Sequence, residues 1–222
     1  TIEYSLNSGQ SWITLNSSDN ISVSTSDKVL FRGTVTPTST GIGRFRATAN
    51  FDVEGNPLSL TYGDDFEGKS LSKYHLSNLF NGCSTLQSAK NLILSNITLS
   101  IYCYQGMFNG CTSLTTAPQL LATTLANGCY SHMFDGCTSL TTAPELLATT
   151  LANYCYMDMF DGCTSLNSIK CLATNITATY CTNNWVNGVA ASGTFTKAAS
   201  ISEDVWTRGT NGIPSGWTVK DA

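Results

Sequence analysis

Cysteine and histidine are the residues whose spacing in this chain first suggests chemistry. Cys129, His132 and Cys137 form a CxxHx4C pattern, and cysteine and histidine side chains are the usual ligands of zinc. A zinc site needs three or four converging ligands, however, and a second copy of the same segment has Asp158 in place of His132 while both of its cysteines are present. The cysteines thus occur without the histidine, and we predict no metal and no cofactor.

The nine cysteines could form disulfides, but their number is odd. Pairing within each repeat unit is one arrangement; buried free thiols are the other, because free cysteine packs as a small apolar residue. We favour buried thiols, since Val189 and His75 take cysteine positions in two outlying units. Eight cysteines fall into two rows that follow the repeat, Cys83, Cys111, Cys137 and Cys163 in one and Cys103, Cys129, Cys155 and Cys181 in the other, and Cys171 belongs to neither.

Catalytic residues are hard to find in this sequence. Neither of its two histidines, His75 and His132, belongs to a nucleophile motif, and we expect His75 to be a buried structural residue. Paired carboxylates for glycoside hydrolysis meet only in space, so the sequence leaves them open. The acidic stretch 64–68 could offer oxygen ligands to calcium, but it lacks the EF-hand spacing and reads better as a linker turn. We therefore predict that the chain is not an enzyme.

A repeat of about 26 residues must position all of these side chains. Residues 107–132 and 133–158 match at 21 of 26 positions, with a longer copy at 79–106 and a diverged copy at 159–184. Self-similarity at such a period marks a stack of structural units. Within a unit, Leu125, Cys129 and Met133 recur at helical spacing, and a glycine then ends the predicted helix. An extended stretch follows, which Pro144 interrupts in the second copy.

Strand and helix in alternation require parallel strands joined by crossover connections. Strands lie ~4.8 Å apart, whereas helices need about 8–10 Å, so the stack should curve with its strands on the concave side. The sequence therefore predicts an α/β fold, a leucine-rich-repeat solenoid of short parallel strands plus helices, with a small N-terminal antiparallel β domain. The predicted domains are an N-terminal cap at 1–68, the solenoid at 69–184 and a C-terminal cap at 185–222.

The two caps contain strand patterns of their own. A hairpin is predicted around residues 7–10, and Gly193 to Lys197 reads as a last strand. Trp185, Trp206 and Trp217 are expected to close the end of the stack. Further strands are predicted at 21–24, 29–31, 44–51 and 58–62.

The motif MFxGCTSL, followed by TTAPEL and LANYCY, resembles the BspA-like leucine-rich repeats of bacterial surface proteins, of the Bacteroides type, over residues 79–184. The resemblance implies a secreted or outer-surface protein. It also implies adhesion to host proteins or neighbouring cells, and it supplies no catalytic residues.

The amino-acid composition limits the kinds of partner that we expect the chain to bind. Charged residues make up 12% of the chain, about half of the usual ~25%, and the net charge is −4. The sequence has no basic patch of the kind that binds nucleic acid. No apolar run approaches the ~20 residues of a membrane-spanning helix. We predict a cell-surface recognition or adhesion module that binds a protein or a glycan; a structural spacer within a larger cell-envelope protein is the alternative.

Two surfaces could carry that binding. One is the concave strand face, because strands of successive units would present their side chains to one ligand together. The other is a row of tyrosines, which could stack on sugars or anchor a protein, or else pack between neighbouring helices. The candidate residues are Thr116, Gln119, Thr142 and Glu145 on the strand face and Tyr104, Tyr130 and Tyr156 in the row.

Overall fold

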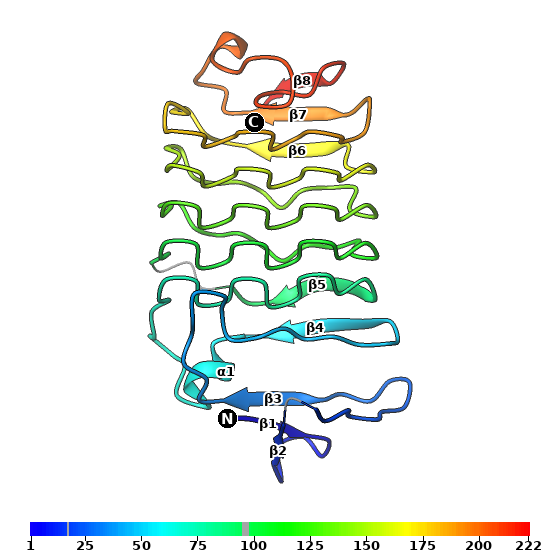
Figure 1. Ribbon diagram of the computed structural model, residues 1–222. Coiled ribbons are helices and arrows are strands. Elements are labelled where there is room, and N and C mark those ends of the chain that lie inside the picture. Colours follow the sequence, from blue (N-terminus) through cyan, green and yellow to red (C-terminus); the bar gives the residue numbers. More distant parts are fainter. Residues whose placement is uncertain (17, 95–97) are drawn as a thin grey trace.

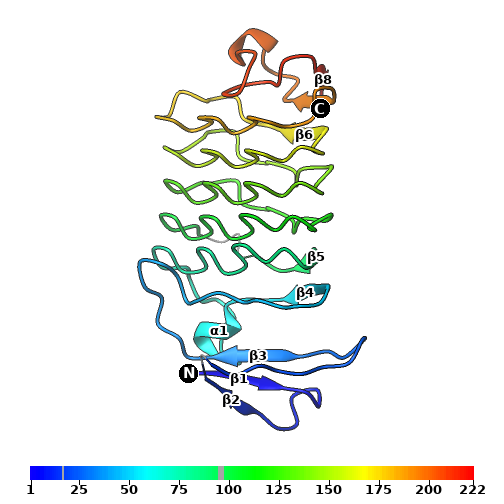
Figure 2. The ribbon, with the colours of Figure 1, turned by 45° about the vertical axis from the view of Figure 1, so that its right-hand side comes forward.

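The computed structural model describes residues 1–16, 18–94 and 98–222. The chain winds into layers that lie one on another, with the N-terminus at one end of the stack and the C-terminus near the other (Figure 1). Figure 2 shows the stack from a second direction, with the short helix α1 (Ser59–Tyr62) between the first strands and the layers that follow. We use the word layer for one such turn of the chain.

The first three strands form an antiparallel sheet in the order β2-β1-β3. Ile2 pairs with Leu15, which confirms the hairpin predicted around residues 7–10. The Ser5 hydroxyl accepts hydrogen bonds from the backbone N–H groups of Asn7 and Gly9, and these bonds hold the turn. The strands are β1 (Ile2–Ser5), β2 (Ile13–Leu15) and β3 (Leu30–Gly33).

Three other strand predictions in this region are wrong. Residues 21–24 form no strand, and the regular pairing expected for 44–51 begins only with β4 (Phe51–Gly55). The alternation of Phe45 with small residues is misleading, because Ala47 and Ala49 are exposed rather than buried. Residues 59–62 of the predicted strand 58–62 form helix α1, whose entry is held by a hydrogen bond from the Leu58 N–H to the Asn56 side chain.

A second sheet joins the N-terminal region to the repeats. Strand β4 pairs in parallel with β5 (Leu86–Leu92), which belongs to the first repeat copy, and Phe51 lies opposite Leu86. The N–H of Phe45 also bonds to the carbonyl of Leu79 at 2.8 Å. Part of the predicted cap is therefore itself a layer, bonded to the first repeat as the repeats are bonded to one another.

The predicted α/β leucine-rich-repeat solenoid is wrong. The described part of the chain consists of strands, turns and loops with three small sheets, and its only helices are the four-residue α1 and the 3-10 turn η1 (Glu203–Val205). Segments 101–110, 127–136 and 153–162, where each repeat is expected to be helical, are runs of consecutive turns. The helical repeat that the family resemblance implied is therefore wrong as well.

Consecutive turns explain both the misleading pattern and the backbone bonding. A residue with positive φ recurs every fourth position, as at Tyr102, Gly106 and Gly110. Alternate N–H groups bond within a turn, such as Met107 to the Tyr104 carbonyl at 3.2 Å, and the others reach the next layer, such as Gly106 to Ser131 at 2.9 Å. A period of four residues resembles the helical 3.6 over two turns, so the inward positions imitate a helix face.

The core consists of columns of identical or similar side chains, one from each layer. Phe80, Phe108, Phe134 and Phe160 stack with ring centroids 5.5 to 5.8 Å apart. Leu86, Leu114, Leu140 and Leu166 are all fully buried, as their stacking in the sequence predicts. A further column differs from the prediction: Leu146 pairs with Cys171 rather than Leu172, so that cysteine takes the core position.

The far end of the stack is a parallel sheet in the order β6-β7-β8. Strand β7 confirms the predicted last strand, with Phe195 lying opposite Ile169. The three tryptophans are buried at this end, and the rings of Trp185 and Trp206 stack at 5.6 Å. The strands are β6 (Ser168–Cys171), β7 (Thr194–Lys197) and β8 (Thr218–Asp221).

Candidate binding surface

The strand-side candidates lie together on two adjacent layers. Thr116, Gln119, Thr142 and Glu145 are all exposed, and Thr116 and Thr142 line a single shallow hollow. Glu145 is partly neutralised, since its Oε1 atom lies 3.2 Å from Nζ of Lys170 in the next layer. We call the outward positions of segments 115–121 and 141–147 the strand-side surface.

The tyrosine row lies in the core. Tyr104, Tyr130 and Tyr156 are at most 2% exposed, and their rings stack on one another at 5.8 and 6.3 Å. Desolvation raises the pKa of Tyr130 and of Tyr156 well above the usual value. These rings can contact no external ligand in this structure, so packing accounts for the row and the strand side is left as the candidate surface.

The hollow has a volume of about 340 Å³ and lies between two nearly identical segments. Four threonines, two alanines and one proline line it, and all of them belong to the described part of the chain. No charged side chain lines it. The lining residues are Thr115, Thr116, Ala117, Thr141, Thr142, Ala143 and Pro144.

Backbone hydrogen bonds that join the neighbouring layers are missing at the hollow. In the layer interface before it, Thr115 N–H bonds to the Gln87 carbonyl and Ala89 N–H to the Thr116 carbonyl, both at 2.9 Å. In the interface after it, Asn167 N–H bonds to the Thr141 carbonyl at 3.0 Å and Ala143 N–H to the Ser168 carbonyl at 2.9 Å.

The equivalent bonds across the hollow would run from Thr141 N–H to the Thr115 carbonyl and from Ala117 N–H to the Thr142 carbonyl. Neither is formed between these residues, although all four belong to the described part of the chain. Four backbone groups, two donors and two acceptors, are thus left to solvent or to a ligand.

Two prolines lie beside this gap. Pro118 and Pro144 occupy equivalent positions on the two sides of the interface, whereas the neighbouring layers have Lys90 and Lys170 there. Proline has no N–H to donate to a ladder. Of these three interfaces, the one that lacks the bonds is thus the one with proline on both sides.

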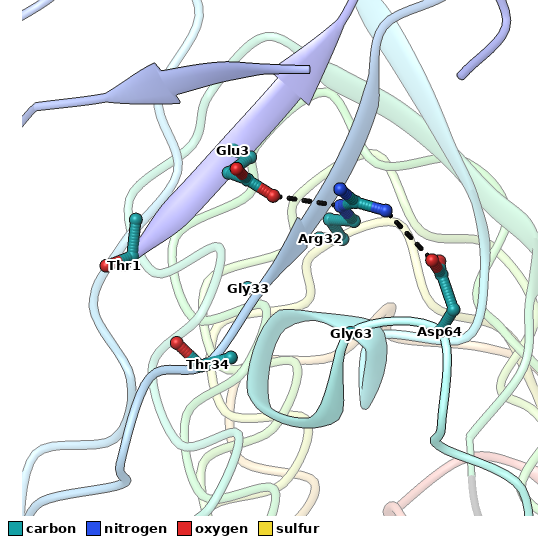
Figure 3. Close-up of a pocket in the computed structure, with 7 residues that line it drawn as sticks. All are labelled: Thr1, Glu3, Arg32, Gly33, Thr34, Gly63 and Asp64. Carbon is teal, nitrogen blue, oxygen red and sulfur yellow. Dashed lines mark hydrogen bonds and ion pairs between the residues drawn. The ribbon is translucent and has the colours of Figure 1, made fainter. Parts of the chain in front are cut away.

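A second hollow, of about 400 Å³ at the N-terminal end, is lined by side chains that pair with one another (Figure 3). Arg32 donates from Nε to Glu3 at 2.9 Å and from a terminal nitrogen to Asp64 at 2.8 Å. The same guanidinium lies over the ring of Trp12 at 4.1 Å. These contacts neutralise the arginine and join β1, β3 and the segment after α1, so they indicate a structural role.

The remaining chemical candidates have structural partners. His132 lies 3.5 Å from a carboxylate oxygen of Asp135 and 3.5 Å from one of Asp158, which together raise its pKa. His75 is fully buried as predicted, with its Nε2 atom 2.9 Å from the Thr61 hydroxyl. Within the described residues, no group of three or more histidine, cysteine, aspartate or glutamate side chains could hold a metal ion.

The cysteines are buried free thiols, which confirms the prediction. Burial raises the pKa of Cys103 and Cys155 to about 12. Three thiols of one row also bond between layers: Cys111, Cys137 and Cys163 donate from Sγ to the carbonyls of Phe80, Phe108 and Phe134 at 3.0 to 3.2 Å. Packing and these bonds account for the cysteines without a reactive role.

Sequence reasoning missed several lining residues. It selected Thr116 and Thr142 from their outward direction, but it passed over Thr141 and Ala117, whose backbone N–H groups are unpaired. The available signal was the proline that recurs at one position in two adjacent copies, Pro118 and Pro144. Leu121 is exposed and Leu147 half-buried at equivalent positions of the two segments, and the sequence pattern does not distinguish them from core leucines.

Comparisons with known proteins found no matching family model, no matching curated protein and no matching solved structure. They lend no support to the BspA-like resemblance or to the adhesion that it implied, and neither is used below. Among the residues that the structure describes, no helix has the length and apolar character that crossing a membrane would require.

Proposed function

We propose that this chain is a non-enzymatic recognition module that binds its ligand on the strand-side surface. The observation that carries the proposal is the hollow between segments 115–117 and 141–144, where unpaired backbone groups and threonine hydroxyls face outward. Every other chemically capable group described above already has a partner within the protein or lies in the core.

The layered structure supports this role physically. Fully buried columns of phenylalanine and leucine hold the layers at fixed spacing, so the exposed side chains of adjacent layers keep fixed positions. A rigid surface loses little conformational freedom when it binds. The hollow is shallow and uncharged, which favours a neutral ligand that spans two or more layers over a small molecule enclosed in a pocket.

A structural spacer is the second candidate function. Its supporting observation is that the two termini lie toward opposite ends of a rigid stack, so the chain could hold neighbouring segments apart (Figure 1). The two functions differ in one testable respect: a spacer has no ligand that depends on the strand-side surface.

The test begins with a screen of the isolated chain against a glycan array and a panel of extracellular-matrix proteins. Any ligand found is then titrated against a variant in which Thr116, Gln119, Thr142 and Glu145 are all alanine. A control variant, Asn127→Ala with Tyr180→Ala, changes exposed residues on the turn side instead. We expect the first variant to lose binding and the control to keep it, with both folded by circular dichroism. Equal affinity of both variants for the ligand would contradict the proposal.

A further inference from the structure

We infer that the open interface between Thr115–Ala117 and Thr141–Pro144 is a subsite for a saccharide, whose adjacent hydroxyl groups replace the missing hydrogen bonds between the layers. The inference rests on the proposed function, since it assigns a ligand class to the same surface. It follows from the hydrogen-bond donors and acceptors that the hollow presents and from the ligand groups that could pair with them.

The hollow offers donors and acceptors in alternation. Ala117 N–H and Thr141 N–H are donors, and the carbonyls of Thr115 and Thr142 are acceptors. The hydroxyls of Thr116, Thr141 and Thr142 have no hydrogen-bond partner among the described residues, so each can act either way. A hydroxyl group on a ligand can accept from a backbone N–H and donate to the opposite carbonyl, which bridges the gap as the lost N–H···O bond would have done.

Other classes of ligand fit less well. An anion would meet no cation in the lining, and a cation would meet no carboxylate there. An extended peptide inserted as a strand would need the two layers to move apart by a further ~4.8 Å, although they are bonded on both sides of the gap. Neutral hydroxyls need no such movement and no charge partner.

Apolar side chains extend the site along the same two layers. Leu121 is 48% exposed, and Leu147 is half-buried; each lies four residues beyond the alanine that lines the hollow. Sugar rings have apolar C–H faces as well as hydroxyl edges. An oligosaccharide that places one ring in the hollow could therefore lay the next ring against these leucines, and we expect oligosaccharides to bind more tightly than single sugars.

The discriminating variant removes both prolines from the interface. In Pro118→Ala with Pro144→Ala, both strands regain an N–H at the facing positions, and we expect the ladder between the layers to close. Amide hydrogen exchange reports this directly, because Ala117 and Thr141 should exchange faster than Ala143 and Asn167 in the parent and equally slowly in the variant. The variant keeps every threonine of the lining, so loss of binding cannot be attributed to lost side chains.

A second variant removes hydroxyls and leaves the backbone alone. Thr116→Val with Thr142→Val preserves side-chain shape, and Thr124→Val with Thr150→Val is the matched control on the same two layers, also exposed. Saccharides that bind on the array, together with oligomers of glucose, mannose, galactose and N-acetylglucosamine at millimolar concentration, are the probes. We expect the proline variant and the first threonine variant each to lose about tenfold or more in affinity, and the control to match the parent.

The outcomes separate this inference from the proposed function. Fast exchange of Ala117 and Thr141 that slows when saccharide is added, with binding lost in the proline variant, supports it. Slow exchange at both amides in the free parent overturns it, as does full saccharide affinity in a proline variant whose amides are protected. If only a matrix protein binds, and the strand-side alanine variant abolishes that binding, the inference fails while the proposed function stands. If no probe of either class binds, both fail.

Discussion

Gly128 lies against the ring of Tyr102 in the adjacent layer, so closely that a Cβ atom on Gly128 would stand 2.0 Å from Tyr102 Cε1. The next repeat copy has Tyr154 at the position of Gly128, one of the five differences between the two copies. Tyr102 stacks on Tyr74 at 5.2 Å, and Tyr154 packs on Tyr180 at 5.6 Å. The glycine therefore interrupts a column of tyrosines because the ring of one of them occupies its side-chain space.

This contact predicts the effect of Gly128→Ala. The substitution should destabilise the protein by about 1–3 kcal/mol through overpacking, beyond the cost of a positive φ. Gly68→Ala is the control, because Gly68 has a similar φ of +69° but no atom within 4 Å of the added Cβ. It should show only the left-handed penalty, roughly 1–2 kcal/mol. Urea unfolding of both variants, and of Gly128→Ala with Tyr102→Ala, checks this; failure of the second substitution to restore stability would contradict it.

The leucine columns predict a contrast between two leucines of adjacent layers. Leu140 is fully buried, so Leu140→Ala should cost about 2–5 kcal/mol from lost burial and the cavity that remains. Leu121 is 48% exposed, and Leu121→Ala should change stability by no more than about 0.5 kcal/mol. Thermal and urea unfolding measure both. Similar losses in the two variants would mean that the inward and outward positions are wrongly assigned.

The buried thiols predict a loss of stability at alkaline pH. Burial raises the pKa of Cys103, Cys111 and Cys155 from the usual 9.0 to about 12. The native state therefore keeps these protons when the unfolded chain has lost them. Their contribution is fully present below pH 9 and declines as the pH rises toward 12, by up to about 1.4 kcal/mol per pH unit for each thiol.

Urea unfolding at pH 7, 9 and 10 tests this decline, with all samples kept reduced. Thiol titration supplies an independent check: close to nine groups should react in denaturant, and almost none in the native state. Rapid reaction of several thiols in the folded protein would show that the layers open readily at these positions.

His75 predicts a second, acid-side dependence. Desolvation lowers its pKa from 6.5 to about 4, so the unfolded chain binds a proton that the native state does not bind between these values. Its contribution to stability is present above pH 6.5 and is lost as the pH falls toward 4, to an extent of about 3 kcal/mol. His75→Gln retains a donor and an acceptor without titrating. The difference between parent and variant should therefore shrink or reverse at low pH, and a constant difference would exclude the mechanism.

The sequence by itself determined the layers and their core. The 26-residue match and the columns of Phe108 and Phe134 or Leu114 and Leu140 follow from repetition, because identical segments in contact must stack identical side chains. The hairpin at residues 7–10 and the strand β7 were predictable from local turn and strand signals.

Only the tertiary structure decided the backbone conformation that carries these columns of side chains. A residue that points inward every fourth position fits a helix and a run of turns almost equally well, and hydrogen bonds to the next layer, such as Gly106 to Ser131, select the turns. The same is true of the tyrosine row, which burial assigns to the core. The open interface lies where Pro118 faces Pro144, a relationship across layers that no single segment contains.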